Sequence, residues 1–505
     1  MKHYIYLLLI LLIDGDPLKA APKIEVKPTA EVILEGRVLD LPAQGAKQKI
    51  TVTVHIATFA ANITTAPTTK YVVEADSNNY FKLVIAAPAK RFYMHLSFAP
   101  NGNAFIDHIY LLEQGDKLKC TLSKGNFSFS GKGSAKLNCQ SQIYQARYRA
   151  TNATLAKAKN GVWAEVFEAA ASQQDSILQV RLAIVESFAP LLGKDMANIM
   201  RANCYGLSYF TMLRTERIAS LVPGRFTAFI NSTAFKKLPH VALIDTVALL
   251  ASPNYTDFLF EQLLMTNMSK NDGKLIRNAA NLMQIYSQIK QGYSGLLGEK
   301  LMVLFFLNFK ENAPLDGFFI DALQHLHHPE YRALVLDVQK KKMRGQPFYP
   351  FEMEDEKGNL VKLSDFKDKV VLIDFWFTGC GACKLLNTAM APVVSQFRDQ
   401  PRVKFLSVSI DADKNRWLSS IQSGAYTHKE SINLYAGGQS SSSGNLHPLI
   451  KAYDVSVFPT MFLLRDNKIV ELTPPRPSAT DHQDPQGGNT MKLIQLINKA
   501  LNDGG

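Results

Sequence analysis

The chain has 505 residues and a formal net charge of +12, with 47% hydrophobic and 20% charged residues. This composition excludes a globally disordered chain, and the length favours several domains over a single core. The lysines and arginines are spread along the chain without interleaved aromatic residues, so the positive charge indicates a solvated basic surface and not a nucleic-acid-binding one.

The first 21 residues have the pattern of a secretory signal peptide. A basic start at Lys2 precedes an apolar run over residues 4–13, and Ala20 and Ala21 lie near a plausible cleavage point. The run is too short to span a bilayer. Two aspartates directly after it are unusual, which leaves an uncleaved membrane anchor open as an alternative. We therefore expect the protein to work in the periplasm or cell envelope.

Residues 30–136 are expected to form a β-rich domain. Apolar and polar residues alternate in short segments at 32–38, 50–56, 80–85 and 92–98, with turn residues between them. This spacing predicts an antiparallel β-sandwich or a small barrel. Residues 131–134 superficially match a phosphate-binding loop, but the glycine spacing is wrong, so a turn is the prediction there.

From residue 137 to residue 343 the periodicity becomes helical and predicts a central all-α domain. In one segment Ile177, Val180 and Ile184 fall on a common face, and Pro190 is expected to end the run. Similar helical segments follow at residues 241–250, 258–264, 275–289, 296–309 and 318–326.

A cluster of histidines stands near the end of this helical region. His325 and His328 would share one helix face, which raises the possibility of a metal site. No acidic or cysteine partner is fixed nearby, so a solvated helix end is the preferred interpretation, and we expect no metal.

Five cysteines make an odd count for an exported chain. Cys120 and Cys139 flank a strand and turn region, and either form a structural disulfide or remain buried free thiols. Cys204 is expected to be a buried core residue.

A basic run at residues 340–342, followed by glycine and prolines, marks the clearest domain boundary. Residues 346–502 then alternate strands and helices, which predicts a compact α/β domain. Within it the apolar strand 370–376 is closely followed by Cys380-Gly381-Ala382-Cys383 and a helix-compatible stretch. Two thiols at this spacing at a helix start form a dithiol redox site, with Cys380 as candidate nucleophile and Cys383 as resolving thiol.

The C-terminal region resembles the thioredoxin superfamily, and more closely its exported TlpA/ResA-like thiol-disulfide oxidoreductases. The resemblance covers residues 345–501 and rests on the segment 363–373, Phe375-Trp376 before the dithiol, and residues 457–460 after it. The long stretch between Ile410 and Pro459 fits the insert of this branch. The β-rich region is similar, more loosely, to the N-terminal domain often fused to such modules.

The resemblance implies roles for further residues. Asp374 matches the superfamily's buried acid and would relay a proton to or from Cys383, whereas a surface strand residue is the alternative. Pro459 matches the cis-proline that pairs with an extended substrate. Trp376 and Phe458 either wall the site or simply pack.

Two residues depart from the family pattern around the cysteines. Gly379 stands where tryptophan is common, and Ala382 replaces a frequent proline. Both changes are expected to alter the redox potential, in a direction that the sequence does not give.

The resulting hypothesis is an exported enzyme that exchanges, and by preference reduces, disulfides in protein substrates without a cofactor. Because the chain has no second C-x-x-C, its electrons are expected from a membrane thiol donor, and cytochrome c maturation is the expected context. The alternatives are a disulfide oxidase or isomerase, and a partner-binding envelope protein with a regulatory redox module. A peroxidase is less favoured, because the approach to Cys380 lacks the peroxiredoxin pattern.

Overall fold

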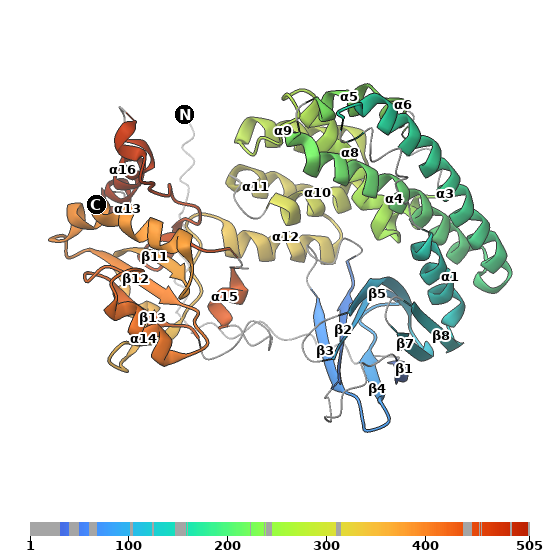
Figure 1. Cartoon of the computed structure of the whole chain (residues 1–505), viewed down its shortest axis with the longest axis horizontal. Helices are drawn as coiled ribbons and strands as arrows, with labels where there is room; N and C mark the ends of the chain where they lie inside the picture. The colour runs from blue at the N-terminus through green and yellow to red at the C-terminus, as the bar shows by residue number, and fades with distance from the viewer. Residues whose placement is uncertain are drawn as a thin grey trace, which may run out of the picture.

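A computed structural model describes residues 31–502 except for 40–49, 60–67, 101–104, 124–125, 147–157, 159, 223, 237, 239–244, 310–314, 438–446, 454, 456 and 485–486. The chain forms a β-rich part, a helical part and a C-terminal α/β part, in that order (Figure 1). The signal peptide predicted at residues 1–21 lies outside the described residues. Within the described ranges, no helix combines the length and the hydropathy that crossing a membrane requires.

The β-rich part contains two four-stranded sheets, with strand orders β4-β1-β7-β8 and β3-β2-β5-β6. Its core lies between them and includes Val52, Met94 and Leu118, because alternate residues of each strand point to the same face. The strands are β1 (Glu31–Val38), β2 (Ile50–Ala57), β3 (Thr69–Glu74), β4 (Tyr80–Ala86), β5 (Arg91–Pro100), β6 (Phe105–Glu113), β7 (Lys117–Ser123) and β8 (Asn126–Lys132).

Two details of the predicted sandwich are wrong. β1 and β7 pair in parallel, so that sheet is mixed and not antiparallel, because strands of the other sheet come between them in the chain. Gly131 and Lys132, predicted as a turn, end β8, and Gly133 with a φ of 91° makes the turn into the first helix.

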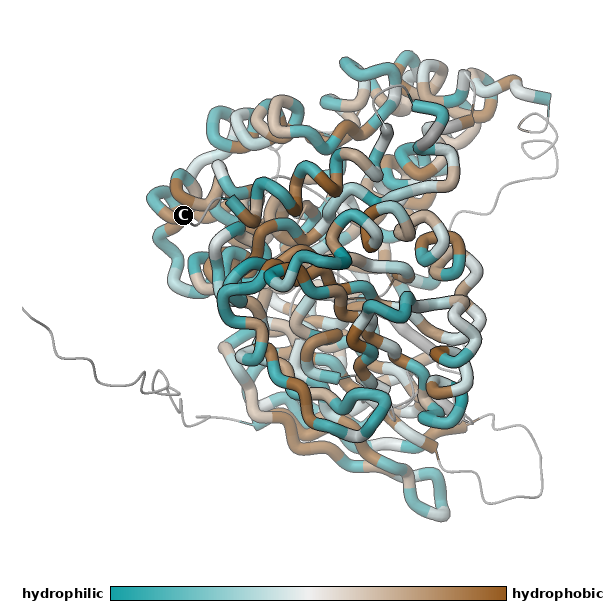
Figure 2. Tube along the Cα trace, turned by 90° about the vertical axis from the view of Figure 1, so that its left-hand side faces the viewer, coloured by the Kyte–Doolittle hydropathy of each residue, from teal (hydrophilic) through white to brown (hydrophobic). Residues whose placement is uncertain are grey.

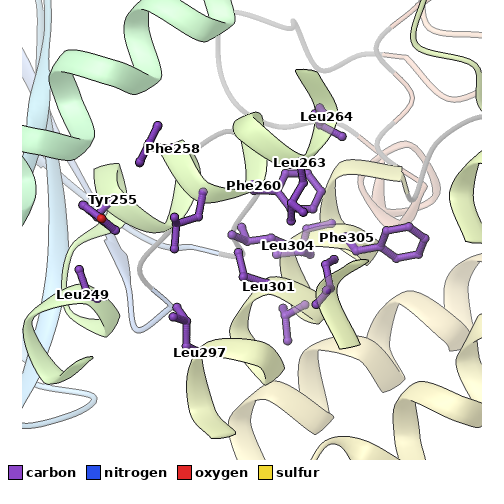
Figure 3. Packing of buried hydrophobic residues seen from close by; sticks show 14 of the residues in the cluster. Leu249, Tyr255, Phe258, Phe260, Leu263, Leu264, Leu297, Leu301, Leu304 and Phe305 are labelled. Carbon is purple, nitrogen blue, oxygen red and sulfur yellow. The ribbon is translucent and has the colours of Figure 1, made fainter. Parts of the chain in front are cut away.

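The helical part packs around a large apolar core. Its α-helices are α1 (Ser134–Gln145), α3 (Trp163–Leu192), α4 (Lys194–Ile218), α5 (Arg225–Asn231), α6 (Thr233–Lys236), α7 (Thr246–Leu250), α8 (Pro253–Ser269), α9 (Ala279–Gly292), α10 (Gly295–Phe309), α11 (Asp316–His325) and α12 (Pro329–Lys342), with a 3₁₀ turn at Ala219–Leu221. Leu301, Leu304 and Phe305 of α10 face Phe260 and Leu263 of α8 in this core (Figure 3). Hydrophobic and hydrophilic residues alternate along the tube in Figure 2. Helices such as α9 bury one side against their neighbours, whereas α8 and α10 are buried along most of their length.

Pro190 does not end its helix, contrary to the prediction. α3 continues to Leu192, and Gly193 with a φ of 73° ends it by donating its N–H to the carbonyl of Ala189. The residues of the basic run 340–342 likewise belong to the last turn of α12 and not to a linker.

The sandwich and the helices share an interface. Tyr93 on β5 donates its hydroxyl to the carbonyl of Ala251 at 2.8 Å, and Tyr144 on α1 donates to the carbonyl of Ile109 at 2.9 Å. Phe59, Tyr93 and Leu111 also join the helical core. The first two parts are therefore packed on one another.

The C-terminal part has a seven-stranded sheet in the order β10-β9-β13-β12-β11-β14-β15. α13 and α16 cover one face, and α15 packs on the other. Its elements are β9 (Glu352–Asp355), β10 (Leu360–Lys362), β11 (Val370–Trp376), α13 (Gly381–Phe397), β12 (Val403–Ser409), α14 (Lys414–Gln422), β13 (Ile432–Tyr435), α15 (Pro448–Ala452), β14 (Thr460–Arg465), β15 (Lys468–Glu471) and α16 (Gly488–Asn502), with 3₁₀ turns at Leu363–Phe366 and Asp481–Gln483.

The disulfide considered between Cys120 and Cys139 is absent, and both residues are free and buried, as is Cys204. Cys120 lies in the core between the two sheets, whereas Cys139 on α1 points into the helical core. Burial raises the pKa of Cys120 and of Cys139 to about 12, and also raises the pKa of Cys204. These thiols are therefore poor nucleophiles at neutral pH.

We predict that alkylation of the reduced native protein is confined to Cys380 and Cys383. Cys120, Cys139 and Cys204 should react only after denaturation, because burial disfavours their thiolates. Peptide mass mapping with two successive alkylating reagents measures this, and a Cys120–Cys139 linked peptide in the oxidised protein would contradict it.

Candidate active site

The dithiol lies between the end of the interior strand β11 and the start of α13 (Figure 1). Cys380 is the N-cap of α13 and is disulfide-bonded to Cys383, with Cα atoms 5.3 Å apart. The backbone N–H of Cys383 donates to the sulfur of Cys380 at 3.1 Å. A sulfur at a helix N-terminus that accepts such a bond is stabilised as a thiolate, which is what a nucleophilic cysteine requires.

The loop before the dithiol is held by groups from neighbouring elements. Thr378 donates its backbone N–H and its hydroxyl to the carboxylate of Asp411, at 2.9 and 2.7 Å. Gly379 donates its N–H to the hydroxyl of Tyr426 at 2.8 Å, and the guanidinium of Arg416 donates to the carbonyl of Thr378 at 3.0 Å. These contacts fix the approach to Cys380, and the sequence analysis missed all three partners.

Gly379 explains one departure from the family pattern. Its φ is 103°, a conformation that side chains of L-residues rarely adopt. A tryptophan at this position would be strained in the present backbone, so the glycine and the loop conformation belong together.

Asp374 is not a surface residue. It lies on the face of β11 that packs against α13, and Ser407 donates a hydroxyl to its carboxylate at 3.2 Å. Burial raises the pKa of Asp374 to about 7, a shift that the hydrogen bond from Ser407 partly opposes.

The part of Asp374 that remains accessible faces a small cavity, which Cys383 also lines. The cavity has a volume of about 20 Å³, enough for one water molecule. The acid and the second cysteine therefore line the same small cavity.

The predicted substrate-binding residues differ in their surroundings. The Phe458–Pro459 peptide bond is cis, and Pro459 lines the same cavity as Cys383. Phe458 is half-buried and meets Phe377 edge to face, with ring centroids 5.5 Å apart. Trp376 is fully buried and stacks on Tyr426 at 4.9 Å, so it packs behind the dithiol and does not contact solvent.

Exposed apolar side chains flank the dithiol, and the sequence analysis did not select them. Phe377, Leu385 and Val457 are 37, 69 and 68% exposed. Phe377 stands three residues before the first cysteine, and Val457 directly precedes Phe458. Their positions next to the two motifs could therefore have indicated them. Together they offer an apolar border to an incoming chain.

For metal binding, the described part of the chain contains no group of three or more His, Cys, Asp or Glu side chains arranged to hold an ion. His325, considered above as a ligand, bonds through Nδ1 to the carbonyl of Asp321 at 2.7 Å. The backbone N–H groups of His327 and His328 donate to the carboxylate of Glu299.

We predict that Gly379→Ala lowers the free energy of unfolding by about 1–3 kcal/mol, because a Cβ strains the backbone at this φ. Gly381→Ala is the matched control, since Gly381 is helical and a Cβ there would meet nothing within 4 Å. Denaturant unfolding of both variants measures the difference, and equal midpoints would contradict the prediction.

We also predict that the stability of the wild type falls as the pH rises from about 4 to about 7. The native state holds a proton on Asp374 up to about pH 7, whereas the unfolded chain releases it near 3.8, so the native state binds more protons in this window. Asp374→Asn should remove this loss and exceed the wild type in stability above pH 7, by about 1.4 kcal/mol per unit of pKa difference.

The gap between Asp374→Asn and the wild type should close at pH 4. Thermal or urea unfolding across this pH range measures it, and the same substitution at the exposed Asp368 is the control. A gap that does not change with pH would overturn the assignment of a raised pKa.

Comparison with known proteins supports the interpretation of this region. The model of the AhpC/TSA family matches residues 344–473. The chain is similar to the thiol-disulfide oxidoreductase ResA of Bacillus subtilis, at 31% identity over 123 residues, which is 24% of this chain and 62% of that protein. ResA of Bacillus thuringiensis is 26% identical over 26% of this chain and 72% of that protein.

Among solved structures, the thioredoxin domain of a thiol-disulfide oxidoreductase from Bacteroides vulgatus is 22% identical over 32% of this chain and 98% of that chain, with a TM-score of 0.25. A thiol:disulfide interchange protein from a Bacteroides species is 23% identical over 32% of this chain and 91% of that chain, with a TM-score of 0.24. These TM-scores are too low to carry an argument.

The chain spans less than two thirds of the length of the first of these relatives, and the family model matches about a quarter of the chain. The C-terminal region is thus a thioredoxin-like domain, and the relatives that share it are thiol-disulfide oxidoreductases.

Proposed function

We propose that the protein is an exported thiol-disulfide oxidoreductase that reduces disulfides in protein substrates through Cys380 and Cys383. The observation that carries this proposal is the sulfur of Cys380 at the N-terminus of α13, where it accepts the N–H of Cys383. This is the environment of an activated thiolate. Asp374, on the cavity shared with Cys383, supplies the base that the second thiol needs.

The reaction proceeds in two exchanges. The thiolate of Cys380 attacks one sulfur of a substrate disulfide, forms a mixed disulfide, and the other substrate sulfur leaves as a thiolate that takes a proton from solvent. Cys383 then gives its proton to the carboxylate of Asp374 and attacks the sulfur of Cys380. The second substrate sulfur leaves as a thiolate that also takes a proton from solvent, so the substrate ends with two thiols. The enzyme retains the Cys380–Cys383 disulfide and has lost two electrons.

In this proposal, the side chains around the dithiol select the substrate. Pro459 and the half-buried Phe458 stand beside the cavity end of the site, and Phe377 and Val457 expose apolar surface next to them. An extended, partly unfolded polypeptide would cover this surface, whereas a small polar disulfide would not.

The electron source must be external. Cys120, Cys139 and Cys204 are buried in the other two parts of the molecule, so they do not reach the dithiol. We propose a membrane thiol donor, and we place the protein in the periplasm or cell envelope on the basis of its first 21 residues. Cytochrome c maturation, in which reduced thiols are needed, is the process that we propose for it.

We predict that Cys383→Ser accumulates a mixed disulfide between Cys380 and the peptide, because the second exchange, which would release the peptide, lacks its nucleophile. Cys380→Ser is the matched control and should form none, since it lacks the attacking thiolate. Non-reducing electrophoresis and mass spectrometry with a disulfide-bonded peptide measure this. Equal trapping by both variants would contradict the assigned order of attack.

The redox potential of the dithiol decides the direction. A value near the thioredoxin potential of about −270 mV supports a reductant, whereas a value near about −120 mV makes the protein an oxidant. If the pair does not cycle at all, a partner-binding protein with a regulatory dithiol replaces the enzyme.

A further inference from the structure

The cavity beside the dithiol has a wall that the proposed mechanism does not use. The segment between α14 and β13 contributes Tyr426, Thr427, His428 and Ser431 to it, opposite Asp374. The imidazole of His428 is half-buried, so it both lines the cavity and reaches the surface. No motif in the sequence pointed to this residue.

Most of the other residues that line the cavity cannot exchange protons, which distinguishes His428 from them. Leu372 and Met461 on the sheet and Met390 on α13 form an apolar floor that cannot carry a proton. Of the lining residues, those with titratable side chains are Asp374, Cys383, Tyr426 and His428. The hydroxyl of Tyr426 is occupied by the N–H of Gly379, and its ring is stacked on Trp376.

Each exchange at Cys383 creates a need for proton transport. The proton that Asp374 takes from Cys383 must leave before the next cycle. When the electron donor reduces the disulfide again, Cys383 must regain a proton. Asp374 is half-buried, and it lines the cavity together with Cys383. A group that faces both the cavity and the solvent could therefore carry protons between Asp374 and the outside.

We propose, building on the function proposed above, that His428 exchanges protons between Asp374 and the solvent through a water molecule in this cavity. In the outward direction the carboxyl of Asp374 loses its proton to the water, and the water gives one to the imidazole. The imidazolium then releases its proton to bulk solvent. Asp374 is again a carboxylate, and the water and the imidazole are as they were before the step. No electrons are transferred.

The hydrogen bonding of His428 suits this role. Its Nε2 lies 2.7 Å from the carbonyl oxygen of Asn387, and because a carbonyl only accepts, Nε2 carries the hydrogen. Nδ1 is then the basic nitrogen that takes up the second proton. An imidazole can both accept and release a proton through its ring nitrogens, which suits exchange with a carboxyl group.

Other charged groups surround the cavity without lining it. The ammonium of Lys384 on α13 lies 5.1 Å from the centre of the Tyr426 ring, and Arg398 pairs with Glu430 at 3.1 Å. Lys429 follows His428 in the chain, and Lys404 lies on β12. These groups set the local potential, but none of them lines the cavity.

The test measures how fast Cys383 resolves a mixed disulfide, by rapid mixing with a disulfide-bonded peptide and acid quench, between pH 5.5 and 8.5. We expect His428→Gln to slow this step about tenfold or more and to flatten its pH profile, because glutamine can donate to the Asn387 carbonyl but cannot exchange protons. The redox potential and the unfolding midpoint should not change. Added imidazole should restore part of the rate in His428→Ala.

His325→Gln is the matched control, because its imidazole also bonds to a backbone carbonyl at 2.7 Å but lies on α11. A pH profile of His428→Gln identical to that of the wild type would overturn the inference, as would an absence of imidazole rescue. His428→Asn replaces His428→Gln if the latter does not fold. If the wild type itself fails to reduce the peptide, the proposed function fails and not this inference alone.

Discussion

The pairing of β11 with β12 on one side and with β14 on the other determines the geometry of the whole site. β11 is a buried interior strand of the sheet, so its end is fixed, and the helix that follows it begins at a fixed point. The antiparallel partner β14 begins directly after Pro459, which therefore comes to lie on the cavity next to Cys383. Cys383 and Pro459, which are far apart in the chain, meet because β12, β11 and β14 are neighbours in one sheet.

Two carboxylates of this domain, Asp411 and Asp374, differ in their hydrogen-bond partners and in their surroundings. Asp411 accepts hydrogen bonds from the backbone and hydroxyl of Thr378 and from the hydroxyl of Ser409, so it acts as an anchor for the loop. Asp374 receives a hydroxyl from Ser407 in a mostly apolar environment, and burial favours its neutral form. The carboxylate with the richer set of donors holds the loop, and the other is the one that we propose to exchange protons.

The sequence was sufficient for features that depend on local pattern. The strands around residues 32–38 and 80–85 and the order strand, dithiol, helix follow from periodicity and short motifs, and the structure contains them. Asp374 was selected through the family resemblance, and the structure shows that it is half-buried. The parallel pairing of β1 with β7 and the separate cores of Cys120 and Cys139 depend on long-range packing, which spacing does not encode. Asp411, Tyr426 and His428 were missed for the same reason, since each reaches the site from a segment with no motif of its own.

The burial of Cys120 and Cys139 in two different cores has a consequence for how the chain matures. In an oxidising medium a folding chain with five thiols can form many wrong pairs, but a bond from Cys120 to any other cysteine would pull a thiol out of its core, because no other cysteine lies in the core of the sandwich. Such a species could not complete either the sandwich or the helical part. Native packing thus selects against such pairs, because only a chain that has kept Cys120 and Cys139 apart gains the full stability of the fold.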